Sequence, residues 1–173
     1  ALMVLVILTL SSCSKRKKEE KDQSVKRVFV ITEIMAVNHI GLMAKDGELY
    51  DWIELKYISN ETVSLSGYSL AFEKSKSKDG EEDDSKIKVW NLPDVKVKPG
   101  SYIIVFASKR GVCEEGELHA SFKLSASGGK LQLRNKDVVV SEVCYGKMED
   151  DVCYRLTTDN NFESSYEQTP GFD

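Results

Sequence analysis

Short runs of β-branched and aromatic residues, separated by turn-forming and charged residues, restrict this chain to an all-β fold. The longest of these runs are residues 28–36, 49–58, 102–107 and 138–145. In residues 49–58, apolar and polar side chains alternate with the period of two that a half-buried strand requires. No segment repeats apolar residues with a helical period between capping residues. About eight or nine such runs at short spacing predict an antiparallel β-sandwich.

A change of phase marks one boundary between strands. Val63 and Leu65 have odd numbers, whereas Leu70 and Phe72 have even numbers. A slip of one residue is typical of a bulge or a sharp bend, and Gly67, which lies between the two pairs, is the residue that tolerates it best.

Residues 74–86 contain no apolar side chain and are predicted to form a long exposed hairpin loop. Their acidic cluster could bind a calcium ion, but it lacks the alternating oxygen ligands of an EF-hand loop, and we favour a solvated loop. We expect no metal and no cofactor, because four cysteines and two histidines match no usual metal-site spacing.

The first residues are predicted to be a targeting signal. Residues 1–10 are almost unbroken apolar sequence, which as a helix would rise about 15 Å, half of the hydrocarbon core of a bilayer. This length suits a secretory signal, truncated at its start, over residues 1–12. The sequence Leu-Ser-Ser-Cys that ends at Cys13 resembles the lipobox of bacterial lipoproteins, which implies cleavage before Cys13 and its acylation. The alternative is an ordinary signal peptide with an incidental cysteine.

Residues 13–27 are predicted to be a disordered, lipid-anchored tether, because residues 14–27 contain seven basic and three acidic side chains and almost no apolar ones. The whole chain has 24 basic and 28 acidic residues, so residues 28–173 have 17 and 25, a net charge of −8. An acidic domain repels phosphate backbones, and we therefore expect no nucleic-acid partner.

Several segments of residues 28–173 together resemble a lamin tail domain, the immunoglobulin-like module of nuclear lamins and of many secreted bacterial proteins. The most specific are Asp-Trp-Ile-Glu-Leu at residues 51–55 and Leu-Ser-Gly-Tyr at residues 65–68. The resemblance implies an immunoglobulin-like sandwich and no catalytic residues. The other matching positions are Glu33, Ile34, Asn38, Val63, Leu70, Trp90, residues 99–102, Val105, His119, Phe122, Leu124, Leu131, Leu133 and residues 169–171.

Four side chains in these motifs invite a chemical interpretation. Glu33 lies on a strand face that also carries Phe29, Ile31 and Met35 by parity, where a carboxylate needs a partner or its pKa rises. We favour a structural carboxylate that accepts backbone or Trp N–H bonds over an acid or base. Trp52 between two carboxylates suits a sugar site, but Asp51 and Glu54 have opposite strand parity, and we favour a structural role.

The two histidines, His39 and His119, are expected in loops or at strand ends. Neither accompanies a nucleophile-elbow motif, and the sequence contains no phosphate loop or dinucleotide fingerprint. We therefore expect no enzyme activity.

Three cysteines remain once Cys13 is assigned to the anchor. Cys144 and Cys153 are expected on adjacent strands, where a disulfide would contribute about 2–3 kcal/mol. A bridge between Cys113 and Cys144 is the rival pairing.

Together these features predict a non-catalytic lipoprotein of the bacterial outer membrane whose sandwich is a binding or adhesion module. The membrane, through the lipid on Cys13, and an unidentified protein or glycan are its expected partners. The alternatives are an accessory domain of a longer secreted enzyme and a structural spacer or scaffold.

Overall fold

The computed structural model describes residues 27–75 and 86–172. The predicted signal over residues 1–12, the anchor at Cys13, nearly all of the tether and most of the acidic loop lie outside these residues.

The described residues form thirteen strands and no helix, and hence no helix that could cross a membrane. The all-β fold predicted from the sequence is confirmed. The strands are β1 (Phe29–Met35), β2 (Trp52–Tyr57), β3 (Val63–Ser64), β4 (Tyr68–Lys74), β5 (Lys88–Asn91), β6 (Lys96–Val97), β7 (Tyr102–Phe106), β8 (Val112–Glu114), β9 (Glu117–His119), β10 (Gly129–Asn135), β11 (Val138–Tyr145), β12 (Cys153–Leu156) and β13 (Phe162–Ser165).

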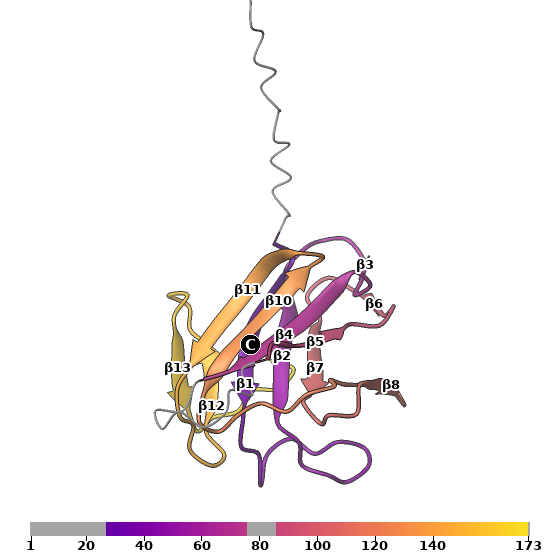
Figure 1. Cartoon of the computed structure of the whole chain (residues 1–173). Coiled ribbons are helices and arrows are strands. Elements are labelled where there is room, and N and C mark those ends of the chain that lie inside the picture. The colour runs from indigo at the N-terminus through magenta and orange to yellow at the C-terminus, as the bar shows by residue number, and fades with distance from the viewer. Residues whose placement is uncertain (1–26, 76–85, 173) are drawn as a thin grey trace, which may run out of the picture.

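The strands build a sandwich of two main sheets. One sheet has the order β13-β12-β1-β2-β7-β9-β8, and the other has the order β11-β10-β4-β5. β3 and β6 form a separate two-stranded sheet. Figure 1 shows β11, β10 and β4 crossing in front of β1 and β2, which places the two main sheets face to face.

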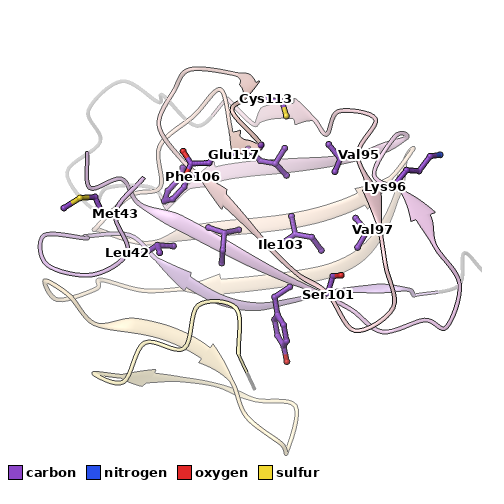
Figure 2. A pocket seen from close by; sticks show the side chains of 14 residues that line it. Leu42, Met43, Val95, Lys96, Val97, Ser101, Ile103, Phe106, Cys113 and Glu117 are labelled. Carbon is purple, nitrogen blue, oxygen red and sulfur yellow. The ribbon is translucent and has the colours of Figure 1, made fainter. Parts of the chain in front are cut away.

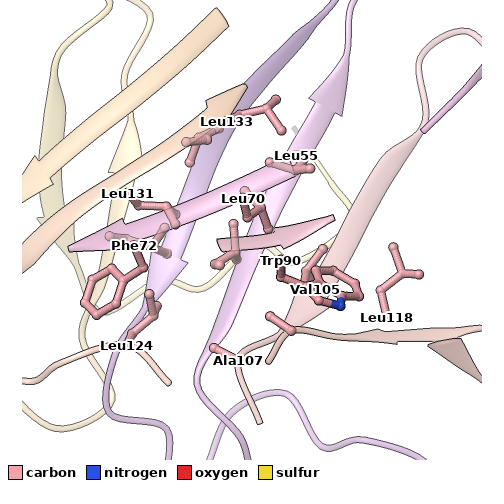
Figure 3. Close-up of a cluster of buried hydrophobic side chains, with 14 of the residues drawn as sticks. Leu55, Leu70, Phe72, Trp90, Val105, Ala107, Leu118, Leu124, Leu131 and Leu133 are labelled. Carbon is pink, nitrogen blue, oxygen red and sulfur yellow. The ribbon is translucent and has the colours of Figure 1, made fainter. Parts of the chain in front are cut away.

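The main core lies between the two sheets. In Figure 3, Leu70, Phe72 and Leu131 of the four-stranded sheet lie near Leu55 and Val105 of the seven-stranded sheet. All five side chains are buried, and burying one such side chain stabilises the fold by about 1.5–3 kcal/mol. Both apolar clusters of the structure lie within residues 28–162, so the sandwich has a core of its own.

A β-bulge at Thr32 corrects the predicted face of Glu33. The register between β1 and β2 shifts between Ile31 and Glu33. Phe29 and Ile31 therefore point into the main core, whereas Met35 packs on the outer face of the seven-stranded sheet. Strict alternation through residues 28–36 placed all four side chains on one face, and the extra residue of the bulge reverses the phase.

The predicted bend at Gly67 is present. A turn closed by the bond from the Tyr68 N–H to the Leu65 oxygen, 3.1 Å, connects β3 to β4, which belong to different sheets. Gly67 has a φ of 87°, in the left-handed region that favours glycine.

Two features of the strands differ from the prediction. There are thirteen rather than eight or nine, because β3, β6, β8 and β9 have only two or three residues and show too little alternation. β7 and β9 pair in parallel, so the sandwich is not purely antiparallel.

Replacement of Gly67 by Ala is expected to destabilise the protein by about 1–2 kcal/mol, because a Cβ disfavours its positive φ. Gly146→Ala is the matched control: that glycine has open space around a Cβ and no positive φ. Denaturant unfolding of both variants checks the prediction, and equal midpoints for the two would contradict it.

Candidate functional site

Two buried carboxylates face each other on the outer side of the seven-stranded sheet. Glu33 of β1 and Glu54 of β2 are partners in the strand register, and each side chain is about 1% exposed. Two buried carboxylates are costly unless hydrogen bonds satisfy them.

The chain near its C-terminal end supplies most of these donors. Thr169 donates its hydroxyl to Oε2 of Glu33 at 2.9 Å and its N–H at 3.3 Å, and Gly171 donates its N–H to Oε2 of Glu54 at 2.6 Å. The Thr32 hydroxyl donates to Oε1 of Glu54 at 2.6 Å. We call this arrangement the carboxylate clasp. Glu33 accepts hydrogen bonds from the N–H and the hydroxyl of Thr169, whereas Trp52 Nε1 donates no hydrogen bond to a described residue.

Burial is the main electrostatic feature of the clasp. It raises the pKa of Glu54, and the neighbouring charge of Glu33 raises it further, while the bonds from Thr32 and Gly171 act against both effects. The clasp oxygens are occupied by the protein's own donors, which is the pattern of a structural site.

Trp52 and Asp51 do not form a sugar platform. The Trp52 side chain is completely buried among Met35, Phe106 and Cys153, so neither ring face is available for stacking. Among the described residues, Trp52 Nε1 is the one buried side-chain polar atom without a hydrogen-bond partner. Burial raises the pKa of Asp51 to about 6, partly offset by the charge of Lys123.

The two histidines have different environments. His39 is exposed, with Nε2 3.9 Å from Asp150, whereas His119 lies at the end of β9 and is buried, stacked against Phe106. His119 Nδ1 lies 3.1 Å from the hydroxyl of Ser108.

This Ser-His contact does not form an accessible nucleophile. Ser108 is 8% exposed, and its hydroxyl accepts the Arg110 N–H at 3.3 Å. His119 lines a small polar pocket on this side of the protein, whereas Ser108 does not. Within residues 27–75 and 86–172, no group of three His, Cys, Asp or Glu side chains is placed to hold a metal ion.

The predicted disulfide between Cys144 and Cys153 is absent, because the two cysteines do not lie on adjacent strands. Cys144 is exposed on β11, whereas Cys153 is buried on β12 of the other main sheet. Cys113 is also a free thiol, so the rival pairing with Cys144 is absent as well. Burial raises the pKa of the Cys153 thiol to about 12, and Glu33 contributes to this shift.

An open apolar cavity lies elsewhere, beside β7. Its volume is about 440 Å³, within the range of ligand pockets. Figure 2 shows Leu42 and Met43 at one end of the cavity and Val95, Lys96 and Val97 toward the other. We call it the β6–β7 groove; it is lined by residues 42–43, 95–97, 101–104, 106, 113 and 116–118.

The groove exists because β6 and β7 diverge. Valines at 95 and 97, a Pro-Gly turn at 99–100 and the apolar run that follows are typical of a hairpin. β6 instead pairs with β3, and β7 pairs with β2 and β9. The alternating valines beside a turn are the sequence signal at this position, but the same pattern is typical of a hairpin and does not predict a groove.

Few charged groups lie at the groove. The Lys96 side chain is 71% exposed, with Nζ 3.9 Å from Asp94. The Glu117 carboxylate accepts the Lys45 N–H at 3.1 Å. The groove therefore suits a ligand that presents uncharged, mostly apolar side groups to it.

No protein-family model matches this sequence. A search of curated proteins likewise finds no significant match. The resemblance to lamin tail domains therefore stays a prediction.

The raised pKa of Asp51 makes stability depend on pH. A folded-state pKa of about 6, above the ordinary 3.8, means that the folded protein holds this proton more tightly than the unfolded chain. The stabilising contribution is complete below pH 3.8 and is lost as the pH rises through 6. Asp51→Asn keeps an acceptor for the Leu124 N–H and removes the charge.

We therefore expect Asp51→Asn to raise the free energy of unfolding by about 1–2 kcal/mol at pH 7.5, after allowance for solvent screening, and to leave it nearly unchanged at pH 3.8. Denaturant titrations at the two pH values measure the difference. A variant that is less stable than the parent at pH 7.5 would show that the charged form is the favoured one.

Proposed function

We propose that this chain is a non-catalytic, lipid-anchored envelope protein whose sandwich binds a ligand through the β6–β7 groove. The groove is the observation that carries the binding role. Its lining includes Leu42, Val97 and Ile103, which combine an apolar surface with a volume of about 440 Å³. Exposed apolar concavities of this size are typical of binding sites.

We further propose that the sandwich is a lamin tail domain, and the carboxylate clasp supports this assignment. The resemblance rests in part on Glu33, Glu54 and residues 169–171, which are far apart in the sequence. These residues meet in one set of hydrogen bonds, between β1, β2 and the chain near its C-terminal end. A shared structural role explains why these residue types occur together.

The anchor is proposed from the sequence alone. A lipobox-like Leu-Ser-Ser-Cys follows the apolar run, and a charged tether separates Cys13 from the sandwich. Acyl chains on Cys13 would hold the sandwich at a membrane, since two or more chains give stable anchoring.

If Cys13 is acylated, the mass of the mature protein and its presence in the membrane fraction can both be predicted. Protein from the membrane fraction of a producing bacterium is expected to begin at Cys13 and to carry acyl chains, as measured by mass spectrometry. Cys13→Ser should release the protein into the soluble fraction, whereas Cys113→Ser, the control at an exposed thiol, should leave it in the membrane. An unmodified Cys13 in membrane-derived protein would refute the anchor.

The groove predicts where a ligand binds. Two probes, a display library of random peptides and a glycan array, are applied to the chain from residue 13 onward with Cys13→Ser. We expect ligands whose affinity falls at least about tenfold in Met43→Arg, which places a charge at the groove.

The matched control is Val89→Arg on β5. Met43 and Val89 are both about half exposed, and Val89 belongs to the other main sheet. Melting temperatures check that both variants fold. Ligands that bind the parent and both variants equally, or no ligand at all, would contradict a binding role of the groove and would favour a spacer.

A further inference from the structure

The β6–β7 groove runs along the edges of strands rather than over a sheet face. Three stretches of successive residues line it: 95–97, 101–104 and 116–118. Successive side chains of a strand point to opposite faces, so a cavity that contacts each of them in turn must lie along the strand edge. The groove is thus a gap between β6 and β7.

One wall of the gap offers a backbone donor. The Ala107 N–H bonds to the Asp51 oxygen on the β2 side, and the Phe106 oxygen accepts the Ala120 N–H on the β9 side. Backbone groups of alternate strand residues point the same way, so the Ile104 N–H points to the β9 side. Within the described residues, the ladder between β7 and β9 begins at Val105, and the Ile104 N–H faces the gap.

The opposite wall offers a donor and an acceptor. The Leu65 N–H bonds to the Val95 oxygen at 2.9 Å, and Val97 is paired with Val63 in the same ladder. The Val95 C=O and the backbone groups of Val97 are therefore directed toward β3, while the Val95 N–H bonds to the Pro93 oxygen at 2.8 Å. Lys96, between them, directs its N–H and C=O away from β3 and toward the gap.

We infer that the ligand of the groove is an extended segment of a partner protein that enters as an additional strand between β6 and β7. This inference rests on the proposed binding function and specifies its ligand. The inserted strand would accept a hydrogen bond from Ile104, exchange bonds with Lys96, and join the two-stranded sheet to the seven-stranded sheet.

The lining of the gap describes the side chains of such a segment. On the core side the gap presents Val97 and Ile103, and on the outer side it presents Leu42 and Ile104. An inserted strand would therefore carry apolar residues on both faces. The stretch from residue 101 to 104 accommodates about three or four extended residues, roughly 13 Å. Proline would not fit where the segment donates to Lys96.

Backbone chemistry favours a peptide over a lipid chain or a glycan. An acyl chain would exclude water from the Ile104 N–H and the Lys96 backbone groups without replacing their hydrogen bonds. Each group left unsatisfied costs about 1–3 kcal/mol. A glycan would meet apolar walls on both sides. An extended peptide can hydrogen-bond to these backbone groups and also place apolar side chains against both walls, as in other cases of strand addition.

The test uses peptides selected from the random display library on the chain from residue 13 onward with Cys13→Ser. Each selected peptide is synthesised with a single N-methyl group at successive amides. We expect methylation of the amide that donates to Lys96 to lower the affinity at least about tenfold, and methylation of its neighbours to change it less than about threefold.

The outcomes separate this inference from the proposed function. Ligands that Met43→Arg weakens but that no N-methyl group weakens would overturn strand insertion and leave the groove a binding site. Ligands found only on the glycan array, and weakened by Met43→Arg, would also overturn strand insertion and leave the groove a binding site. Self-association that Met43→Arg abolishes would make a second copy the ligand and would overturn a partner segment. Absence of any groove-dependent ligand would overturn both proposals.

Discussion

The extra residue at Thr32 in β1 is the constraint on which the arrangement of the sandwich depends. It lets Phe29 and Ile31 fill the main core while Glu33 and Met35 face outward in the same strand. The bulge also leaves the Ile31 N–H to bond with the Ser141 hydroxyl of β11 at 3.0 Å, which connects the two main sheets. Without the change of phase, Glu33 would enter the core, and its partner Glu54 would lose its neighbour in the clasp.

The outer face of the seven-stranded sheet has different surroundings at β1 and β2 than beside β7. At β1 and β2 the chain's own segment around Thr169 and Gly171 covers the sheet and satisfies the buried carboxylates. Beside β7 the neighbouring strands diverge and leave the groove. The same sheet thus has one region whose buried carboxylates are satisfied by internal hydrogen bonds and another, beside β7, where strand edges border a groove.

Local pattern was enough to predict the fold but not the sites. β2 alternates strictly, and its two faces follow from parity alone; the bend at Gly67 follows from a change of phase. The face of Glu33 was missed because a bulge leaves no mark in a run that is apolar on both sides. The cysteine pairing failed because Cys144 and Cys153 lie close in sequence but in different sheets. The groove depends on the pairing of β6 with β3 rather than with β7. A strand of only two residues carries too little pattern to predict which strand it pairs with.

The central claim is that the seven-stranded sheet is hydrogen-bonded at the clasp but has unpaired backbone groups at the groove. Residue-resolved amide hydrogen exchange of the ligand-free protein tests this claim most directly, since it measures the protection of the amides in both regions. We predict slow exchange at Ile103 and Val105, which bond to β2, and at Gly171, which bonds to Glu54. We predict fast exchange at Ile104 and Lys96. Slow exchange at Ile104, equal to that of Ile103, would contradict an open edge, and fast exchange at Gly171 would contradict the clasp.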